Sequence, residues 1–137
     1  MLATIKTTLA YEPEACIELL ATSMKYGNID QILDLYESGA VWSSLVSGKL
    51  LMKEDRDFKI DYMWLTARNA TISVEKMNIV YNAESTIALV ALMAVFEGRD
   101  PDGKDVIIPF ESHLVIRKSH DSSWRIVIDQ SRRVSKN

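Results

Sequence analysis

A carboxylate and an imidazole two residues apart are candidates for proton-transfer chemistry. Glu111 and His113 lie in the run 106–117, which alternates like a strand, so their side chains should point to the same face. A carboxylic acid among apolar neighbours favours its protonated form and can donate a proton, and an imidazole exchanges protons near neutral pH. We therefore predict Glu111 and His113 as catalytic residues. The alternative is that this face meets solvent or a dimer partner and that both are surface polar groups.

Three further residues have the size or polarity to line a ligand pocket. Trp42 and Tyr62 are large aromatic side chains with a polar end, and such side chains suit flat organic ligands. Asp129 lies on the last predicted strand and shares its parity with Val127 and Ser131. We predict Trp42, Tyr62 and Asp129 as ligand-binding residues. Core packing would also account for the two aromatic rings, and a strand-edge position for the carboxylate.

Helical patterns that would support these residues occupy the first half of the chain. Gly27 suits the left-handed residue that ends a helix. Asn28, with Gln31 three residues later, is typical of a capping box, so a second helix is expected from there to about Tyr36. Acidic residues and apolar spacing predict a third helix over about 55–67.

Strand patterns occupy the second half of the chain. In the first long strand, Ile72, Val74 and Val80 have the same parity and should share a face. Consecutive strands joined by short polar turns imply antiparallel hairpins. The predicted strands are 41–46, 50–52, 70–81, 85–97, 106–117 and 124–133.

The strand 85–97 carries apolar side chains on both faces. Ile87, Leu89 and Met93 lie on one face, and Val90 and Phe96 on the other. A strand that is apolar on both faces should be covered on both. Helices would cover one face, and we predict that a second subunit covers the other, which gives a homodimer through the sheet.

This order of elements resembles the nuclear-transport-factor-two-like superfamily, which includes the SnoaL-like polyketide cyclases and the ketosteroid isomerases. The resemblance spans residues 12–133, nearly the whole chain. It is carried by the corner Met24-Lys25-Tyr26-Gly27-Asn28-Ile29-Asp30, followed by Ile32, Leu33 and Tyr36, by the turn Asp100-Pro101-Asp102-Gly103 and by the closing strand Trp124-Arg125-Ile126-Val127-Ile128-Asp129-Gln130-Ser131.

The resemblance implies an α+β fold in which a cone-like curved antiparallel sheet wraps around three N-terminal helices and leaves a mostly apolar pocket. Pro109-Phe110-Glu111 is similar to the isomerase segment that carries an oxyanion-stabilising acid. The position of the isomerase general base, two residues after Trp42, holds Ser44, which we keep as a ligand-binding candidate. The tyrosine of the first isomerase helix corresponds to Leu20, so the same isomerisation mechanism is not expected.

The implied function is binding of a small apolar or aromatic molecule, with cofactor-free isomerisation, cyclisation or dehydration as the reaction classes. The alternative is a non-enzymatic dimeric accessory or protein-interaction module. Both fit one domain, 1–137, with 1–11 and 134–137 expected to be loosely ordered.

The composition of the chain argues against several other classes of function. The net charge of −3 and the scattered basic residues argue against nucleic-acid binding. The longest apolar run, 87–96, is too short for a membrane-spanning helix. A single cysteine, Cys16, suits a reducing compartment, so a cytoplasmic location is expected. Two histidines without metal-ligand spacing, and no glycine-rich phosphate loop, predict neither metal nor cofactor.

Overall fold

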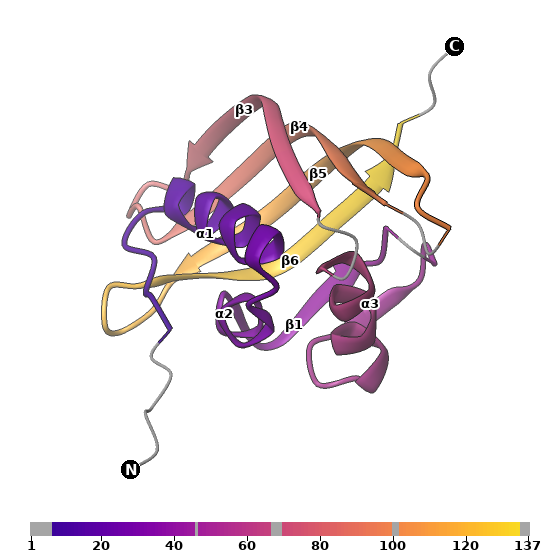
Figure 1. Ribbon diagram of the computed structural model, residues 1–137. Helices are drawn as coiled ribbons and strands as arrows, with labels where there is room; N and C mark the ends of the chain where they lie inside the picture. The colour runs from indigo at the N-terminus through magenta and orange to yellow at the C-terminus, as the bar shows by residue number, and fades with distance from the viewer. Residues whose placement is uncertain (1–6, 46, 67–69, 100–101, 135–137) are drawn as a thin grey trace.

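The computed structural model describes residues 7–45, 47–66, 70–99 and 102–134, which form three helices and one six-stranded sheet (Figure 1). The strand order in the sheet is β2-β1-β6-β5-β4-β3. The elements are α1 (Pro13–Tyr26), α2 (Ile29–Asp34), β1 (Tyr36–Ser43), β2 (Leu50–Met52), α3 (Arg56–Thr66), β3 (Thr71–Tyr81), β4 (Ile87–Arg99), β5 (Asp105–Lys118) and β6 (Trp124–Arg133). The predicted α+β fold is confirmed.

The sheet is mixed, which differs from the expected antiparallel sheet at one pair of strands. Strands β3 to β6 form an antiparallel meander, as their short turns predicted. Strand β1, which comes much earlier in the chain, pairs parallel with β6. The long strands curl around α1 without closing into a barrel, and α3 packs beside β1 and β2 (Figure 1). In the described ranges, no helix is long and apolar enough to cross a membrane.

The corner between α1 and α2 is built as the sequence predicted. Gly27 ends α1 in the left-handed conformation, with φ of 69°. The Asn28 side chain accepts a hydrogen bond from the Gln31 backbone N–H at 3.2 Å. The Gln31 side chain, however, does not complete a capping box. It bonds to both backbone groups of Thr8 and so ties the segment before α1 to α2.

Substitution of Gly27 at this corner should destabilise the protein through backbone strain and not through a steric clash. Nothing lies within 4 Å of the position that a Cβ on Gly27 would occupy. We expect Gly27→Ala to lower the free energy of unfolding by about 1–2 kcal/mol, because an L-residue is strained in the left-handed conformation. Gly27→Asn should cost less, since asparagine tolerates that conformation. Urea denaturation of both variants tests this, and equal losses would contradict it.

The second helix is shorter than predicted, and this changes the position of Tyr36. The helix ends at Asp34, and Tyr36 begins β1, where it pairs with Ile126 of β6. The Leu35 carbonyl accepts a hydrogen bond from the Ile126 N–H at 2.7 Å, which draws the chain into the sheet. Tyr36 is fully buried. Inward-facing residues at helical spacing therefore did not distinguish a longer helix from the start of a strand.

Two β-bulges change which face a side chain takes. In β3, the register shifts between Val74 and Lys76, so Val80 faces the opposite side from Ile72. The prediction that Ile72, Val74 and Val80 share a face is therefore wrong for Val80. In β6, Ile126 and Ile128 pair with the neighbouring residues Ile116 and Val115, so Val127 is the extra residue. A bulge inserts one residue and reverses the alternation beyond it.

Strand β4 has an inner and an outer apolar face, as predicted. The inner residues Val90, Leu92 and Phe96 are buried in the core beneath the helices. The outer residues Leu89 and Met93 are 49% and 43% exposed. Within the chain, the helices thus cover only the inner face of this strand.

Candidate functional site

Four aromatic rings fill the part of the interior between β1 and α3. Trp42 stacks on Tyr62 with 4.6 Å between ring centroids and 24° between planes. Phe58 meets Trp42 and Tyr36 edge-on, at 5.5 and 5.1 Å. All four side chains are fully or almost fully buried. They therefore form a buried cluster of aromatic rings, here called the aromatic wall. This wall carries two phenol hydroxyls, those of Tyr36 and Tyr62.

A chain of hydrogen bonds leads from these phenols to a buried carboxyl group. The hydroxyls of Tyr62 and Tyr36 are hydrogen-bonded to each other. The Tyr36 hydroxyl donates to Oδ2 of Asp129 at 2.6 Å. The Ser131 hydroxyl donates to Oδ1 of Asp129 at 2.7 Å, and it lies 2.5 Å from the Ser112 hydroxyl. Side chains from α3, β1, β5 and β6 thus converge on Asp129.

The bulge in β6 is what turns Asp129 inward. Simple alternation would place Asp129 on the face opposite Ile126, but Val127 is the extra residue, so Asp129 lies on the inner face with Ile126. Trp42 of β1 pairs with Asp129 across the parallel ladder. Bulges are frequent beside functional sites because they re-aim one side chain.

Burial dominates the electrostatics of this site. Loss of solvation raises the pKa of Asp129 above its ordinary value, while hydrogen bonds from Ser131 and Tyr36 oppose the shift. Burial raises the pKa of Tyr36 and of Tyr62 well above the ordinary value of 10.0, and the nearby Asp129 carboxyl raises both further. Both phenols therefore stay neutral and act as hydrogen-bond donors. Asp129 is the group at this site whose pKa burial shifts upward from an ordinarily acidic value.

A small cavity opens onto Asp129. Its volume is about 30 Å³, which has room for a water molecule but not for an organic ligand. The lining comes from α1, β3, β4, β5 and β6 and is apolar except for Ser112 and Asp129. A groove of about 270 Å³ between α1 and β3 shares Ala21 and Ile72 with this cavity. The groove and the cavity therefore adjoin each other between α1 and β3.

The structure brings three predicted ligand-binding residues together and places the fourth elsewhere. Trp42, Tyr62 and Asp129 belong to the interior network described above. Ser44 is buried just beyond β1, where its hydroxyl donates to Asp61 of α3. It is absent from the lining of the cavity. The Ser44 hydroxyl also accepts a hydrogen bond from the Ser47 N–H, so Ser44 stabilises the turn after β1.

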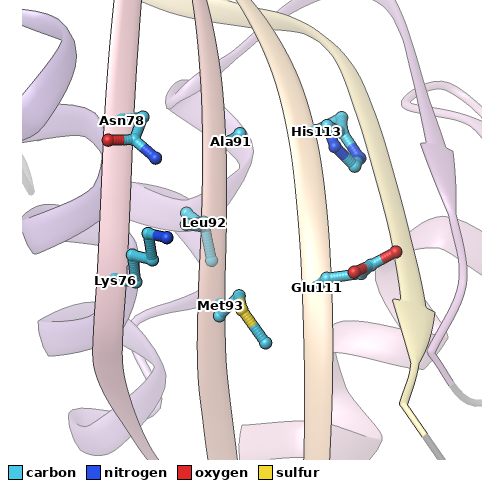
Figure 2. A pocket seen from close by; sticks show the side chains of 7 residues that line it. All are labelled: Lys76, Asn78, Ala91, Leu92, Met93, Glu111 and His113. Carbon is cyan, nitrogen blue, oxygen red and sulfur yellow. The ribbon is translucent and has the colours of Figure 1, made fainter.

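Glu111 and His113 lie on the outer face of the sheet, which is the alternative that the sequence left open. Figure 2 shows them on β5 beside Ala91 and Met93 of β4, over a shallow hollow. Glu111 forms an ion pair with Arg132, and His113 is exposed. Neither lines the interior cavity. The reason is that the other parity of β5 carries the larger apolar side chains, which the core takes up.

Sequence reasoning missed three members of the interior network. The sequence predicts Tyr36 on a helix, and it predicts no role in a site for Ser112 or Ser131. A signal for Ser112 was present, since it shares the inner parity of β5 with Phe110 and Leu114. A small polar residue between two large apolar ones on a core face requires a hydrogen-bond partner.

The polar groups of the site are one carboxyl group and several hydroxyl groups. In the part of the chain that the structure describes, no three His, Cys, Asp or Glu side chains converge where they could hold a metal ion. The reactive group that these residues do provide is the buried carboxyl of Asp129, which is surrounded by hydroxyl groups.

Comparison with known proteins places the fold but not the activity. No protein-family model matches the chain, and no curated protein sequence matches it. A structure from Xanthomonas campestris, provisionally named a calcium/calmodulin-dependent protein kinase II association domain, has a TM-score of 0.79 at 19% identity. That match covers 100% of this chain and 99% of the other.

Two further solved structures carry the names of enzymes. A candidate scytalone dehydratase from Novosphingobium aromaticivorans has a TM-score of 0.76 at 14% identity, over 89% of this chain and 81% of that one. A candidate ketosteroid isomerase from Shewanella frigidimarina has a TM-score of 0.68 at 16% identity, over 85% and 90%. At such identities the likeness is one of fold, and the chain has the fold of ketosteroid-isomerase-like and nuclear-transport-factor-two-like proteins, as the sequence resemblance predicted.

Proposed function

We propose that this protein binds a small, largely apolar molecule next to Asp129 and exchanges a proton with it. The observation that carries the proposal is a fully buried carboxyl group at the floor of an apolar cavity, held by hydroxyl donors on both oxygens. Ligand sites in proteins are mostly apolar with a few placed polar groups. A buried carboxyl whose pKa is raised is also a frequent sign of a functional site.

The ligand enters between α1 and β3. The groove there is lined by Ala21, Thr22 and Lys25 of α1 and by Thr71 and Ile72 of β3. Because the inner cavity is only about 30 Å³, binding requires α1 to move away from the sheet and widen it. Three side chains of α1 line the cavity and would be displaced by such a movement: Ile17, Leu20 and Ala21.

The reaction class that fits is a proton transfer without a cofactor, such as an isomerisation or a dehydration. Two proteins with this fold are provisionally named for those reactions. In its charged form Asp129 accepts a proton from a carbon beside a carbonyl group, and in its neutral form it returns that proton elsewhere on the ligand. The neutral Tyr36 hydroxyl holds the carboxyl in place through the reaction.

Ligand binding can be tested with matched carboxyl variants. Native mass spectrometry on the protein incubated with a panel of small cyclic ketones and phenols should detect a one-to-one complex. Asp129→Asn should weaken that complex or, where turnover is measurable, reduce the rate about 10²–10⁴-fold, the usual contribution of one acid–base group. Glu111→Gln, on the outer face, should leave both unchanged.

The opposite result from the two variants would reject this site. If Glu111→Gln impaired binding while Asp129→Asn did not, the ligand would bind on the outer face of the sheet. If no compound bound to either variant or to the unmodified protein, the second candidate would be favoured. That candidate is a non-enzymatic dimeric accessory module, and the small volume of the inner cavity, about 30 Å³, supports it. The cytoplasm stays the predicted location under either function.

A further inference from the structure

A second polar side chain, that of Ser112 on β5, lies at the inner cavity beside Asp129. Ser112 is 3% exposed and, together with Asp129, supplies the polar part of the cavity lining. Its hydroxyl lies 2.5 Å from the Ser131 hydroxyl, which bonds to Oδ1 of Asp129 at 2.7 Å. Ser112 is therefore joined to the carboxyl through a single intermediate hydroxyl, and we call this pair of serines the serine arm.

The direction of these hydrogen bonds follows from the number of hydrogens, because each hydroxyl has one to donate and a charged carboxyl has none. Ser131 donates to Oδ1 of Asp129, so its contact with Ser112 requires Ser112 to be the donor. Tyr36 donates to Oδ2, so Tyr62 must donate to Tyr36. While Asp129 is charged, every hydrogen in the network points toward it. Ser112 then has only lone pairs to offer to the cavity.

The serine arm reverses when Asp129 is neutral. A hydrogen on Oδ1 would meet the hydrogen of Ser131, so Ser131 must turn its own hydrogen toward Ser112. Ser112 must then point its hydrogen into the cavity. Each serine keeps its hydrogen and only rotates its hydroxyl group, and the one added proton comes from water or from the ligand.

The tyrosines on the other side of the carboxyl do not have this freedom. A hydrogen on Oδ2 would require Tyr36 to donate to Tyr62, and the Tyr62 hydrogen would then need a new acceptor. In the described part of the chain, the Tyr62 hydroxyl bonds to Tyr36 alone, and three aromatic rings pack against its ring. A buried donor without an acceptor is destabilising. The added proton therefore resides on the side of the serine arm.

Asp129 is the single titratable residue among the described residues that line the cavity, because α1, β3 and β4 contribute apolar side chains there. The titratable groups bonded to it or to its partner are the phenols of Tyr36 and Tyr62, and burial raises the pKa of both. The charge of Asp61 on α3 acts on Tyr62, and Asp61 itself accepts a hydrogen bond from Ser44. The direction of the serine arm therefore depends on the protonation of Asp129.

We propose that Ser112 contacts the ligand, and that its hydroxyl accepts a hydrogen bond from the ligand while Asp129 is charged and donates one while Asp129 is neutral. The cavity then favours an alcohol or phenol in the first state and a ketone or aldehyde in the second. This inference rests on the proposed function, because it takes the ligand to bind beside Asp129.

The reversal also has a use in the proposed reaction. When Asp129 takes a proton from a carbon beside a carbonyl group, negative charge develops on the carbonyl oxygen. The same proton reverses the serine arm, so Ser112 becomes a donor as that charge appears. A donor aimed at charge that develops in the transition state is an effective form of catalysis.

The first test needs no ligand. Carbon-13 NMR of protein with labelled aspartate follows the titration of Asp129, whose signal is assigned by its loss in Asp129→Asn. Ser112→Ala should lower the pKa of Asp129, because the neutral form loses the acceptor for the Ser131 hydrogen. Ser131→Ala should raise the pKa, because the charged form loses its direct donor. Ser73→Ala, at an exposed position of β3, should leave it unchanged.

The second test uses two rings that differ in one group. Cyclohexanol and cyclohexanone are titrated into the protein below and above the measured pKa of Asp129, and ligand-observed NMR gives their dissociation constants. The ratio of the constants should move in favour of cyclohexanol by about tenfold as Asp129 becomes charged, the effect of one hydrogen bond. Ser112→Ala should remove most of this change, and Ser73→Ala should retain it. Ser112→Cys, which fills the space with a weaker acceptor, should behave like Ser112→Ala.

The outcomes separate this inference from the proposed function. Binding of both rings with a ratio that does not change with pH would overturn the inference and leave the proposed function standing. A rise in the pKa of Asp129 in Ser112→Ala would also overturn it, because Ser112 would then act only as a donor toward the carboxyl. Failure of both rings to bind at any pH would count against the proposed function and against the ligand classes together.

Discussion

Replacing Trp42 by alanine should lower the free energy of unfolding by about 3–5 kcal/mol, the usual loss for a large buried aromatic side chain. Trp42 is 2% exposed, stacks on Tyr62 and meets Phe58 edge-on. Its removal leaves a cavity at the centre of the aromatic wall, and the rigid neighbouring rings cannot collapse into it. Urea denaturation followed by circular dichroism measures the loss.

Two control variants separate this packing effect from a general sensitivity of the protein to the loss of any aromatic side chain. Trp42→Phe keeps a ring in the cluster and should cost clearly less than Trp42→Ala. Tyr26→Ala, at a side chain that is 73% exposed, should change stability by about 0.5 kcal/mol or less. If Trp42→Ala cost no more than Tyr26→Ala, the aromatic cluster would not be the centre of the core.

The stability of the protein should fall as pH rises through the pKa that Asp129 has in the folded state. Burial raises this pKa above the ordinary value of 3.8, so the folded state holds a proton that the unfolded state has already lost. The contribution of Asp129 to the free energy of unfolding is fully present below the pKa that this group has in the unfolded state. It is lost as pH rises through the pKa in the folded state. Between the two pKa values the slope is at most about 1.4 kcal/mol per pH unit.

Two Asp→Asn variants isolate this contribution. Asp129→Asn should remove the fall, so the variant gains relative stability toward neutral pH. Asp121 behaves oppositely, because hydrogen bonds from Ser123 lower its pKa and its contribution is lost as pH falls. Asp121→Asn should therefore lower stability at neutral pH. Chemical denaturation at a series of pH values measures both, and a pH profile unchanged by Asp129→Asn would show that its carboxyl is not strained by burial.

The sequence predicted most of the fold because local patterns specify most of its elements. Gly27 and Asn28 identified the helical corner, and period-two apolar runs located β3 to β6. The parallel contact between β1 and β6 has no local signal, since it joins residues about ninety positions apart. The segment before α1 is hydrogen-bonded to distant parts of the chain, because Thr8 bonds to Gln31 and the Ala10 carbonyl accepts from the Trp124 N–H. Residues 1–6 and 135–137 lie outside the described residues.

The candidate site was harder to predict because its geometry depends on a bulge. The chemistry of their side chains is enough to predict Trp42, Tyr62 and Asp129 as site residues. The orientation of Asp129 toward the core, however, depends on the extra residue Val127. Glu111 and His113 have side chains that could transfer protons, but their positions in β5 place them on the outer face of the sheet. Ile108, Phe110 and Ile116 bury more apolar surface than the Glu111 face could, so the core takes their side of the strand.

The parallel pairing of β1 with β6 also has a consequence for how the protein is made. Tyr36 cannot reach Asp129 until the ribosome has released the residues of β6. At about 5–20 residues per second, the emerging helices and β1 wait several seconds with apolar surface uncovered. Such long-range closure slows folding and lengthens exposure to aggregation. Chaperone binding to the nascent chain should therefore concentrate on the segment from α2 to α3 and end when β6 emerges.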